Sequence, residues 1–251
     1  MRRLLIVLAL LLPLTSCAEE LAVAAAADLN FAMKEIAQQY QHDTGNTLKL
    51  SFGSSGNFFV QIQNGAPFDL FFSADSSYPE KLAQAGLADS LSLYRYAVGT
   101  IVLWVPDSSR LDLKHGINVL LDPSIHKIAI ANPATAPYGR AAEHALKQAG
   151  IYDRVKDKLV LGENISQTAQ FVQTGNADIG IIAESLALAP TMKSAGRYME
   201  VPSQLYTPIQ QAAVIVTSSR KKTAAEQFLN YLQQPAARVI LQRYGFTLPS
   251  R

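Results

Sequence analysis

Hydrophobic and polar positions follow two different periods along this chain. Short, nearly continuous apolar runs predict strands at 20–27, 69–74, 100–105, 127–132 and 178–183, and alternation of apolar and polar residues predicts one at 47–52. Apolar residues three or four positions apart predict helices at 29–40, 57–64, 77–86, 139–150, 165–175, 223–233 and 236–245. Glycine closes several of these helices, where the chain needs a left-handed residue.

Strands that alternate with helices predict an α/β fold built from strand–helix–strand units and mostly parallel sheets. Such sheets place ligand sites at the carboxyl ends of their strands, near the helix N-termini. The 251 residues are enough for one large core or two smaller ones. No repeat, low-complexity segment or proline- and glycine-rich linker marks a boundary between domains.

Four of the predicted strand-to-helix junctions are rich in small residues. They read AAAADLN at 24–30, FGSSGN at 52–57, ANPATAPYG at 131–139 and GENIS at 162–166. The first turn of a helix has free backbone N–H groups at the positive end of the helix dipole. Glycine lets a ligand approach the backbone, and serine hydroxyls add donors. If the sheets bring the junctions together, the sequence predicts a site for an anion.

Each of these residues also has a simpler structural interpretation. Ser54 and Ser55 are typical helix-capping residues, and Asp28 is placed to cap the helix that begins near residue 29. Tyr138 fits an ordinary half-buried tyrosine. Local sequence leaves the two interpretations open for each position.

Signals for catalysis and cofactors are missing. The four histidines are scattered, with no pair four residues apart, so the sequence predicts no metal site. Neither of the glycine-rich nucleotide-binding motifs occurs. The segment GSSGN is not the GxSxG of a hydrolase, and no histidine is evidently placed to activate Ser55. A secreted α/β hydrolase is therefore a weak alternative, and we expect neither an enzyme nor a cofactor.

The first 18 residues predict export. Two arginines precede an apolar run and small residues, which is typical of a signal peptide and too short for a membrane span. Without Arg2 and Arg3 the chain carries 20 basic and 20 acidic residues, so nucleic acid and membrane surfaces are not expected partners. Cys17 is the only cysteine, which excludes an internal disulfide. Cleavage after Ala18 gives a soluble exported protein, and acylation of Cys17 is the alternative.

Several longer segments carry a more specific signal. The chain resembles the bacterial periplasmic molybdate-binding proteins of ABC importers in essentially the whole of its mature part. The segments that carry this resemblance are GSSGNFFVQIQNGAPFDLFFSAD (53–75), YAVGTIVLW (96–104), IAIANPATAPYGRAA (128–142), ADIGIIAESLA (177–187) and QQPAARVILQRYGFTLP (233–249).

The resemblance implies a two-lobed periplasmic binding protein of the type II kind, with the ligand in the cleft between lobes that close like a hinge. The lobes would comprise residues 19–98 with 212–251, and residues 99–211. The family binds molybdate and tungstate, performs no chemistry on them and delivers them to a membrane permease. It also implies a monomer in the periplasm.

The resemblance further implies which residues contact the anion: Ala27, Asp28, Ser54, Ser55, Tyr138 and Ile165. Ser55 would donate its hydroxyl and N–H, Tyr138 its phenol or N–H, and Ile165 its N–H alone. These groups would contact the oxygens of molybdate and would not ligate the metal. No lysine or arginine is among them, so selectivity would depend on cavity size and neutral donors.

Asp28 departs from the family pattern, in which many members have a hydroxyl or amide donor. An ionised carboxylate about 4 Å from a bound charge would add a repulsion of ~4 kcal/mol at an effective dielectric constant of ~20. Three outcomes are open. Asp28 turns away and caps its helix; or it is protonated or accepts a proton from a different ligand; or the protein prefers another tetrahedral anion, such as sulfate.

Overall fold

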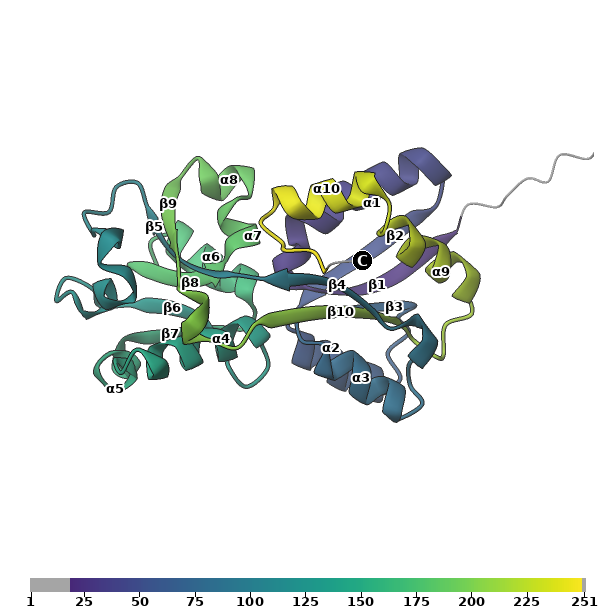
Figure 1. Cartoon of the computed structure of the whole chain (residues 1–251), viewed down its shortest axis with the longest axis horizontal. Helices are drawn as coiled ribbons and strands as arrows, with labels where there is room; N and C mark the ends of the chain where they lie inside the picture. The colour runs from purple at the N-terminus through teal and green to yellow at the C-terminus, as the bar shows by residue number, and fades with distance from the viewer. Residues whose placement is uncertain (1–18, 250–251) are drawn as a thin grey trace, which may run out of the picture.

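The computed structural model describes residues 19–249, and the predicted signal peptide with Cys17 lies outside this range. The described chain forms two lobes side by side, each with a five-stranded sheet and helices on both faces (Figure 1). Within residues 19–249, no helix is both long and apolar enough to span a membrane.

The first sheet has the order β2-β1-β3-β10-β4 and the second the order β7-β6-β8-β5-β9. The strands are β1 (Glu20–Ala26), β2 (Thr47–Gly53), β3 (Leu70–Ser73), β4 (Tyr94–Gly99), β5 (Ile101–Pro106), β6 (Ile128–Ala131), β7 (Leu159–Gly162), β8 (Ile179–Ala183), β9 (Gly196–Glu200) and β10 (Ile209–Ile215).

The α-helices flank these sheets. They are α1 (Asn30–Thr44), α2 (Ser55–Gln63), α3 (Ser77–Gln84), α4 (Pro137–Gln148), α5 (Tyr152–Val155), α6 (Ile165–Gln173), α7 (Glu184–Ala187), α8 (Pro190–Lys193), α9 (Lys222–Tyr231) and α10 (Pro235–Arg243). Five short 3-10 helices complete the described chain: η1 (Ala27–Leu29), η2 (Ser90–Ser92), η3 (Leu113–Leu121), η4 (Lys156–Lys158) and η5 (Ser203–Leu205).

The α/β class is confirmed, but the expectation of mostly parallel sheets is wrong. In the first sheet β1 pairs in parallel with β2 and β3, whereas β10 runs antiparallel to β3 and β4. In the second sheet β6 is parallel to β7 and β8, and β5 is antiparallel to β8 and β9. The antiparallel pairings arise because β4 carries the chain out of the first lobe and β10 brings it back.

Two chain segments cross between the lobes. Thr100 alone separates the end of β4 from the start of β5, and the second crossing runs from β9 through η5 to β10. The pairing of β10 with β4 shifts register between Gln211 and Ala212. Figure 1 shows β4 and β10 lying side by side where they approach the second lobe. The predicted lobe boundary at 98/99 falls next to the first crossing, and the one at 211/212 falls inside β10.

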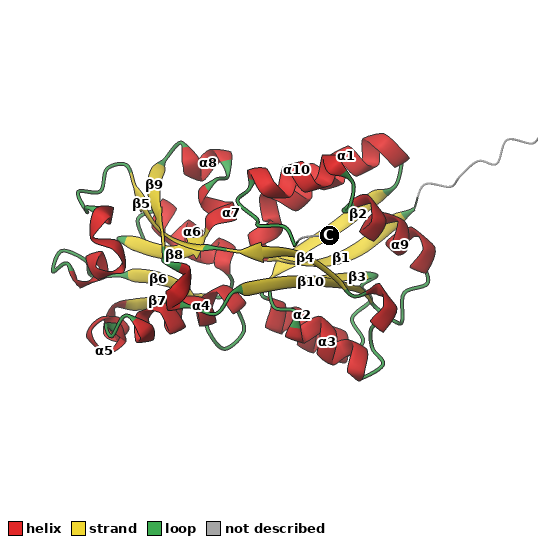
Figure 2. Cartoon of the chain, in the orientation of Figure 1, coloured by secondary structure: helices red, strands yellow, loops and turns green. Residues whose placement is uncertain are grey.

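The core of the first lobe forms on both faces of its sheet, as period-two alternation requires. Phe72 packs toward α1 and α9, with its ring centroid 6.0 Å from that of Phe228, while Phe71 packs on the opposite face with the residues of α2 and α3. Helix α1 meets the sheet through Ala32, Met33, Ile36 and Tyr40, which lie on one helical face. Figure 2 shows helices above and below the strands of both lobes.

Asp69, directly before β3, connects three segments of the first lobe through hydrogen bonds. Its Oδ2 accepts from the Ala22 N–H at 2.8 Å and its Oδ1 from the Ser219 hydroxyl at 2.6 Å. Asp69→Ala leaves both donors without this acceptor, so we expect the free energy of unfolding to fall by ~1–3 kcal/mol, measured by urea denaturation. The control, Glu226→Ala on the exposed face of α9, should change it by less than ~0.5 kcal/mol. Equal effects of the two substitutions would contradict the assignment.

Candidate ligand-binding site

The four small-residue junctions leave their sheets in adjacent pairs. Ala26 at the end of β1 lies opposite Gly53 of β2, so the first two junctions begin side by side. In the second lobe, Ala131 at the end of β6 lies opposite Gly162 of β7, so the other two are also neighbours. Parallel pairing thus places two helix starts of each lobe at one sheet edge.

Hydrogen bonds between the lobes join the two pairs. The Gly56 N–H donates to the Thr135 carbonyl at 2.9 Å, and the Ser166 hydroxyl donates to the Ala27 carbonyl at 2.8 Å. The predicted contact residues are all at most 4% exposed: Ala27, Asp28, Ser54, Ser55, Tyr138 and Ile165. The structure therefore brings all four junctions together in a buried region between the lobes.

Gly56 shows why the second junction needs small residues. A Cβ atom at this position would lie 2.7 Å from the backbone oxygen of Thr135, closer than real contacts allow. Only glycine lets the first turn of α2 meet the loop before α4 at this distance. Gly56, the second glycine of the GSSG segment, is therefore required for this contact between the lobes.

Ser54 and Ser55 have different roles in the structure. The Ser54 hydroxyl accepts from the Asn57 N–H at 3.4 Å and caps α2, as its simpler interpretation expects. The Ser55 hydroxyl oxygen instead accepts from the Ala74 N–H at 2.9 Å, just beyond β3. This bond uses an oxygen lone pair and leaves the hydroxyl hydrogen of Ser55 available to donate.

Tyr138 and Ile165 lie at the starts of α4 and α6. First-turn N–H groups such as theirs have no carbonyl four residues earlier in the same helix. At α6, Asn164 accepts from the N–H groups of Ser166 and Gln167, which leaves that of Ile165 outside the cap. Ser55 has the corresponding position in α2. Three helix starts thus contribute backbone donors to one region.

Asp28 is the charged residue among these contacts. Its Oδ2 accepts from the Gln211 side-chain amide at 2.7 Å and from the Tyr138 hydroxyl at 3.0 Å. The side chain makes no capping hydrogen bond to η1 or α1, so of the three open outcomes the structure does not show the one in which Asp28 turns away and only caps its helix. The phenol of Tyr138 is engaged by Asp28, which leaves the N–H as the free donor of the two predicted for Tyr138.

Burial governs the protonation of this network. It raises the pKa of Asp28 to about 6, although hydrogen bonds from Gln211 and Tyr138, and the backbone N–H groups of Asp28 and Leu29, lower it. Burial, together with the neighbouring Asp28, raises the pKa of Tyr138 well above its usual value. The tyrosine therefore keeps its proton and remains a donor at any pH at which the protein functions.

Three residues of this network were not predicted from the sequence. Gln211 on β10 donates to Asp28, and its Oε1 accepts from the Tyr96 hydroxyl on β4 at 2.6 Å. Ser185 at the start of α7 donates to the Asp28 carbonyl at 2.7 Å. The one available signal, which concerns Gln211, was a pair of glutamines at the start of an otherwise apolar segment, QQAAVIV at 210–216.

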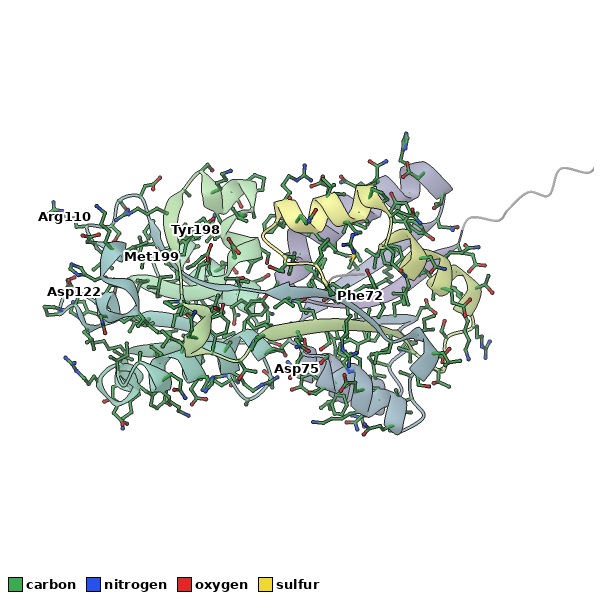
Figure 3. The ribbon with its side chains drawn as sticks, in the orientation of Figure 1. Phe72, Asp75, Arg110, Asp122, Tyr198 and Met199 are labelled. Atoms are coloured by element: carbon green, nitrogen blue, oxygen red, sulfur yellow. The ribbon has the colours of Figure 1, made fainter. Side chains whose placement is uncertain are left out.

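Charged side chains lie at the margin of the site. Arg140 on α4 donates to Asp75 at 2.6 Å, which pairs the two lobes, and Figure 3 shows Asp75 at the edge of the first lobe that faces the second. This pair lines a cavity of about 570 Å³ beside the second crossing. A second cavity, of about 420 Å³, is lined by Ala27, Asn164 and Ser166 and so borders the junctions.

The described residues offer little support for a hydrolase or a metal centre. Across residues 19–249, no cluster of three or more histidine, cysteine or acidic side chains is arranged to hold a metal ion. Ser55 bonds to the Ala74 N–H, and none of the histidines in this range bonds to it. A nucleophilic serine needs an adjacent base, which Ser55 lacks here.

Comparisons with known proteins agree with this arrangement. A family model described as bacterial extracellular solute-binding protein matches residues 21–247. The molybdate-binding protein ModA of Azotobacter vinelandii is 42% identical over 238 residues, covering 95% of this chain and 94% of that protein. ModA of Rhodobacter capsulatus is 40% identical over 235 residues, covering 94% and 91%.

The likeness extends to three dimensions. The solved structure of the periplasmic molybdate-binding protein of Azotobacter vinelandii superimposes with a TM-score of 0.87 at 35% identity, covering 92% of this chain and 100% of that one. The two-lobed fold expected from the sequence is thereby confirmed. The chain belongs to the family of bacterial extracellular solute-binding proteins, and it is a binding protein rather than an enzyme.

Proposed function

We propose that this protein binds molybdate or tungstate and delivers it to the membrane permease of an ABC importer. The observation that carries the proposal is the meeting of four junctions from two lobes in one buried region. Their free donors are neutral, and Arg140, a cation on the same helix as Tyr138, is paired with Asp75. Relatives named for molybdate binding cover nearly the whole chain.

The proposed contacts are the groups that remain free to donate. They are the hydroxyl and N–H of Ser55, the N–H groups of Tyr138 and Ile165, and the backbone N–H of Ala27. All contact anion oxygens and none ligates the metal. Helix N-termini hold a dianion through dipoles, without a neutralising cation. Because the proposed contacts are donors, fully deprotonated anions are favoured.

We further propose that the protein works as a monomer in the periplasm. Residues 1–18 would direct its export, and Cys17 would supply a lipid anchor if cleavage occurs before it. The permease would recognise the closed, loaded form. Binding of sulfate is the alternative for the same fold, and Asp28 is the residue that keeps it open.

Thermal unfolding with single anions tests the proposal. Molybdate and tungstate, at a hundred times their Kd, should each add ~2.7 kcal/mol to stability and raise the Tm of the exported protein. Sulfate and phosphate at equal concentration should not. A rise with sulfate alone would establish the alternative, and no rise with either metal oxyanion would exclude molybdate as the ligand.

The two serines of the second junction should differ in their effect on affinity. Ser55→Ala removes a hydroxyl donor to a charged ligand, so we expect Kd to rise about tenfold to a hundredfold, measured by calorimetry. Ser54→Ala removes the cap of α2 and should lower the free energy of unfolding by ~1 kcal/mol. A comparable rise in Kd for Ser54→Ala would make Ser54 a ligand contact as well.

The Arg140–Asp75 pair should stabilise the closed form. Both side chains are partly exposed, at 37% and 29%, so the contribution is modest. We expect Arg140→Gln to raise Kd about two- to fivefold by favouring separation of the lobes, which small-angle scattering measures. Arg95→Gln, which breaks the Arg95–Glu80 pair within the first lobe, is the matched control and should leave Kd unchanged. Equal effects would refute a role in closure.

A further inference from the structure

Asp28 has one carboxyl oxygen for which the protein supplies no partner. Its Oδ2 receives two hydrogen bonds, whereas Oδ1 is fully buried and has no hydrogen-bond partner within the described residues. The residue as a whole is 1% exposed. Buried polar atoms are normally paired, so an unpaired one at a binding site indicates a group that the structure does not contain.

Within residues 19–249, no recorded hydrogen bond or ion pair gives this carboxyl group a cationic partner. The titratable side chains that act on it are Tyr96 and Tyr138, both neutral donors. Elements α1, α6, α7 and β2 pack on η1, and α4, β10 and β4 supply Tyr138, Gln211 and Tyr96 to the Asp28 network; α6 and β10 have no charged residue. On α4 and β4, Arg140 pairs with Asp75, Glu143 with Lys147 and Arg95 with Glu80, and His144 contacts Gln148. The charged groups of α1, α7 and β2 are engaged elsewhere or exposed: Glu184 faces Glu200, Lys34 lies over Phe52, Glu35 pairs with Arg243, His42 pairs with Asp43, and Lys49 is exposed.

The ionised and protonated forms of Asp28 differ in what they require. The N–H groups of Asp28 and Leu29 act on the carboxyl group but make no hydrogen bond of good geometry to Oδ1, so an ionised Oδ1 is poorly satisfied here, and its charge would repel a dianion. A protonated Oδ1 needs an acceptor, and an oxygen of a tetrahedral dianion is one. The Gln211 amide fixes the orientation of the carboxyl group, because its Oε1 is held by Tyr96 and its Nε2 therefore faces Asp28.

We propose, on the basis of the oxyanion binding inferred above, that Asp28 is the specificity-determining residue of the site and donates a proton from Oδ1 to the bound dianion. The proton comes from solvent, so each binding event takes up one proton whenever the free protein has Asp28 ionised. The site then favours fully deprotonated tetrahedral dianions. An anion that carries its own proton would bring an O–H donor against the O–H donor of Asp28, and two donors cannot form a hydrogen bond.

The direction of the pH dependence follows from the free and bound states. The pKa of Asp28 in this structure is raised to about 6 by burial, and a neighbouring dianion raises it further. Below that pH the proton is already present, and affinity should be constant. Above it, Kd should rise about tenfold per pH unit, until the pKa of the complex is reached.

Calorimetry of the unchanged protein with molybdate tests this directly. Binding heats near neutral pH, in two buffers with different heats of ionisation, give the number of protons taken up. We expect close to one proton per molybdate.

The variant Asp28→Asn keeps the shape of the side chain, and its amide donates a hydrogen bond at every pH. It should therefore bind molybdate with no proton uptake and with a Kd that does not change with pH. Glu184→Gln removes the other carboxyl group with a raised pKa and should keep the uptake.

The outcomes separate this inference from the proposed function. Binding of molybdate without proton uptake would overturn the role of Asp28 and leave the function intact. Loss of uptake in Glu184→Gln, with uptake kept in Asp28→Asn, would also overturn it. Tighter binding of phosphate than molybdate would show that Asp28 accepts a proton instead. Absence of any binding would remove both proposals. If Asp28→Asn fails to fold, the unchanged protein and Glu184→Gln still decide the question.

Discussion

The closed arrangement of this protein depends on one buried contact, in which Asp28 receives hydrogen bonds from Tyr138 and Gln211. The three residues come from different parts of the fold: η1 directly after β1, the start of α4 in the other lobe, and β10, which returns from the second crossing. One carboxyl oxygen of Asp28 thereby connects both lobes to β10, the strand that follows the second crossing. Because the contact is buried, its energy depends strongly on whether every polar atom in it has a hydrogen-bond partner. The closed arrangement is therefore sensitive to the group that meets the unpaired Oδ1 of Asp28.

Chain topology explains why such a contact forms. Parallel pairing of β1 with β2, and of β6 with β7, sends two helix starts from each lobe toward the other. The antiparallel strands β4 and β10 hold the lobes close enough for these starts to meet. Close approach also needs glycine: a Cβ at Gly99 would lie 2.1 Å from the Tyr138 hydroxyl. The site is therefore a product of sheet order, strand register and two positions without a side chain.

The sequence predicted six strands, and each overlaps a strand of the structure: β1, β2, β3, β5, β6 and β8. Five of them are buried, strongly apolar strands, and β2, which is partly exposed, was recognised from its alternation of apolar and polar residues. The missed strands are short or partly exposed, as β7 and β9 are, or continue into another strand, as β4 does, or contain buried polar residues, as β10 does. The four junctions were found because small residues before a helix are visible locally. Gln211 and Tyr96 were not, because their roles depend on pairing between strands more than a hundred residues apart.

The Gly56–Thr135 hydrogen bond has a consequence for communication with a membrane partner. Its two ends belong to different lobes, so it exists only when the lobes meet, and the outer surface around it is continuous only then. A partner that contacts both lobes at once would distinguish the loaded from the empty protein by the relative position of the lobes, without any contact with the cargo. Such recognition depends on the conformation alone, so its selectivity for the loaded protein depends on how rarely the empty protein adopts the closed conformation.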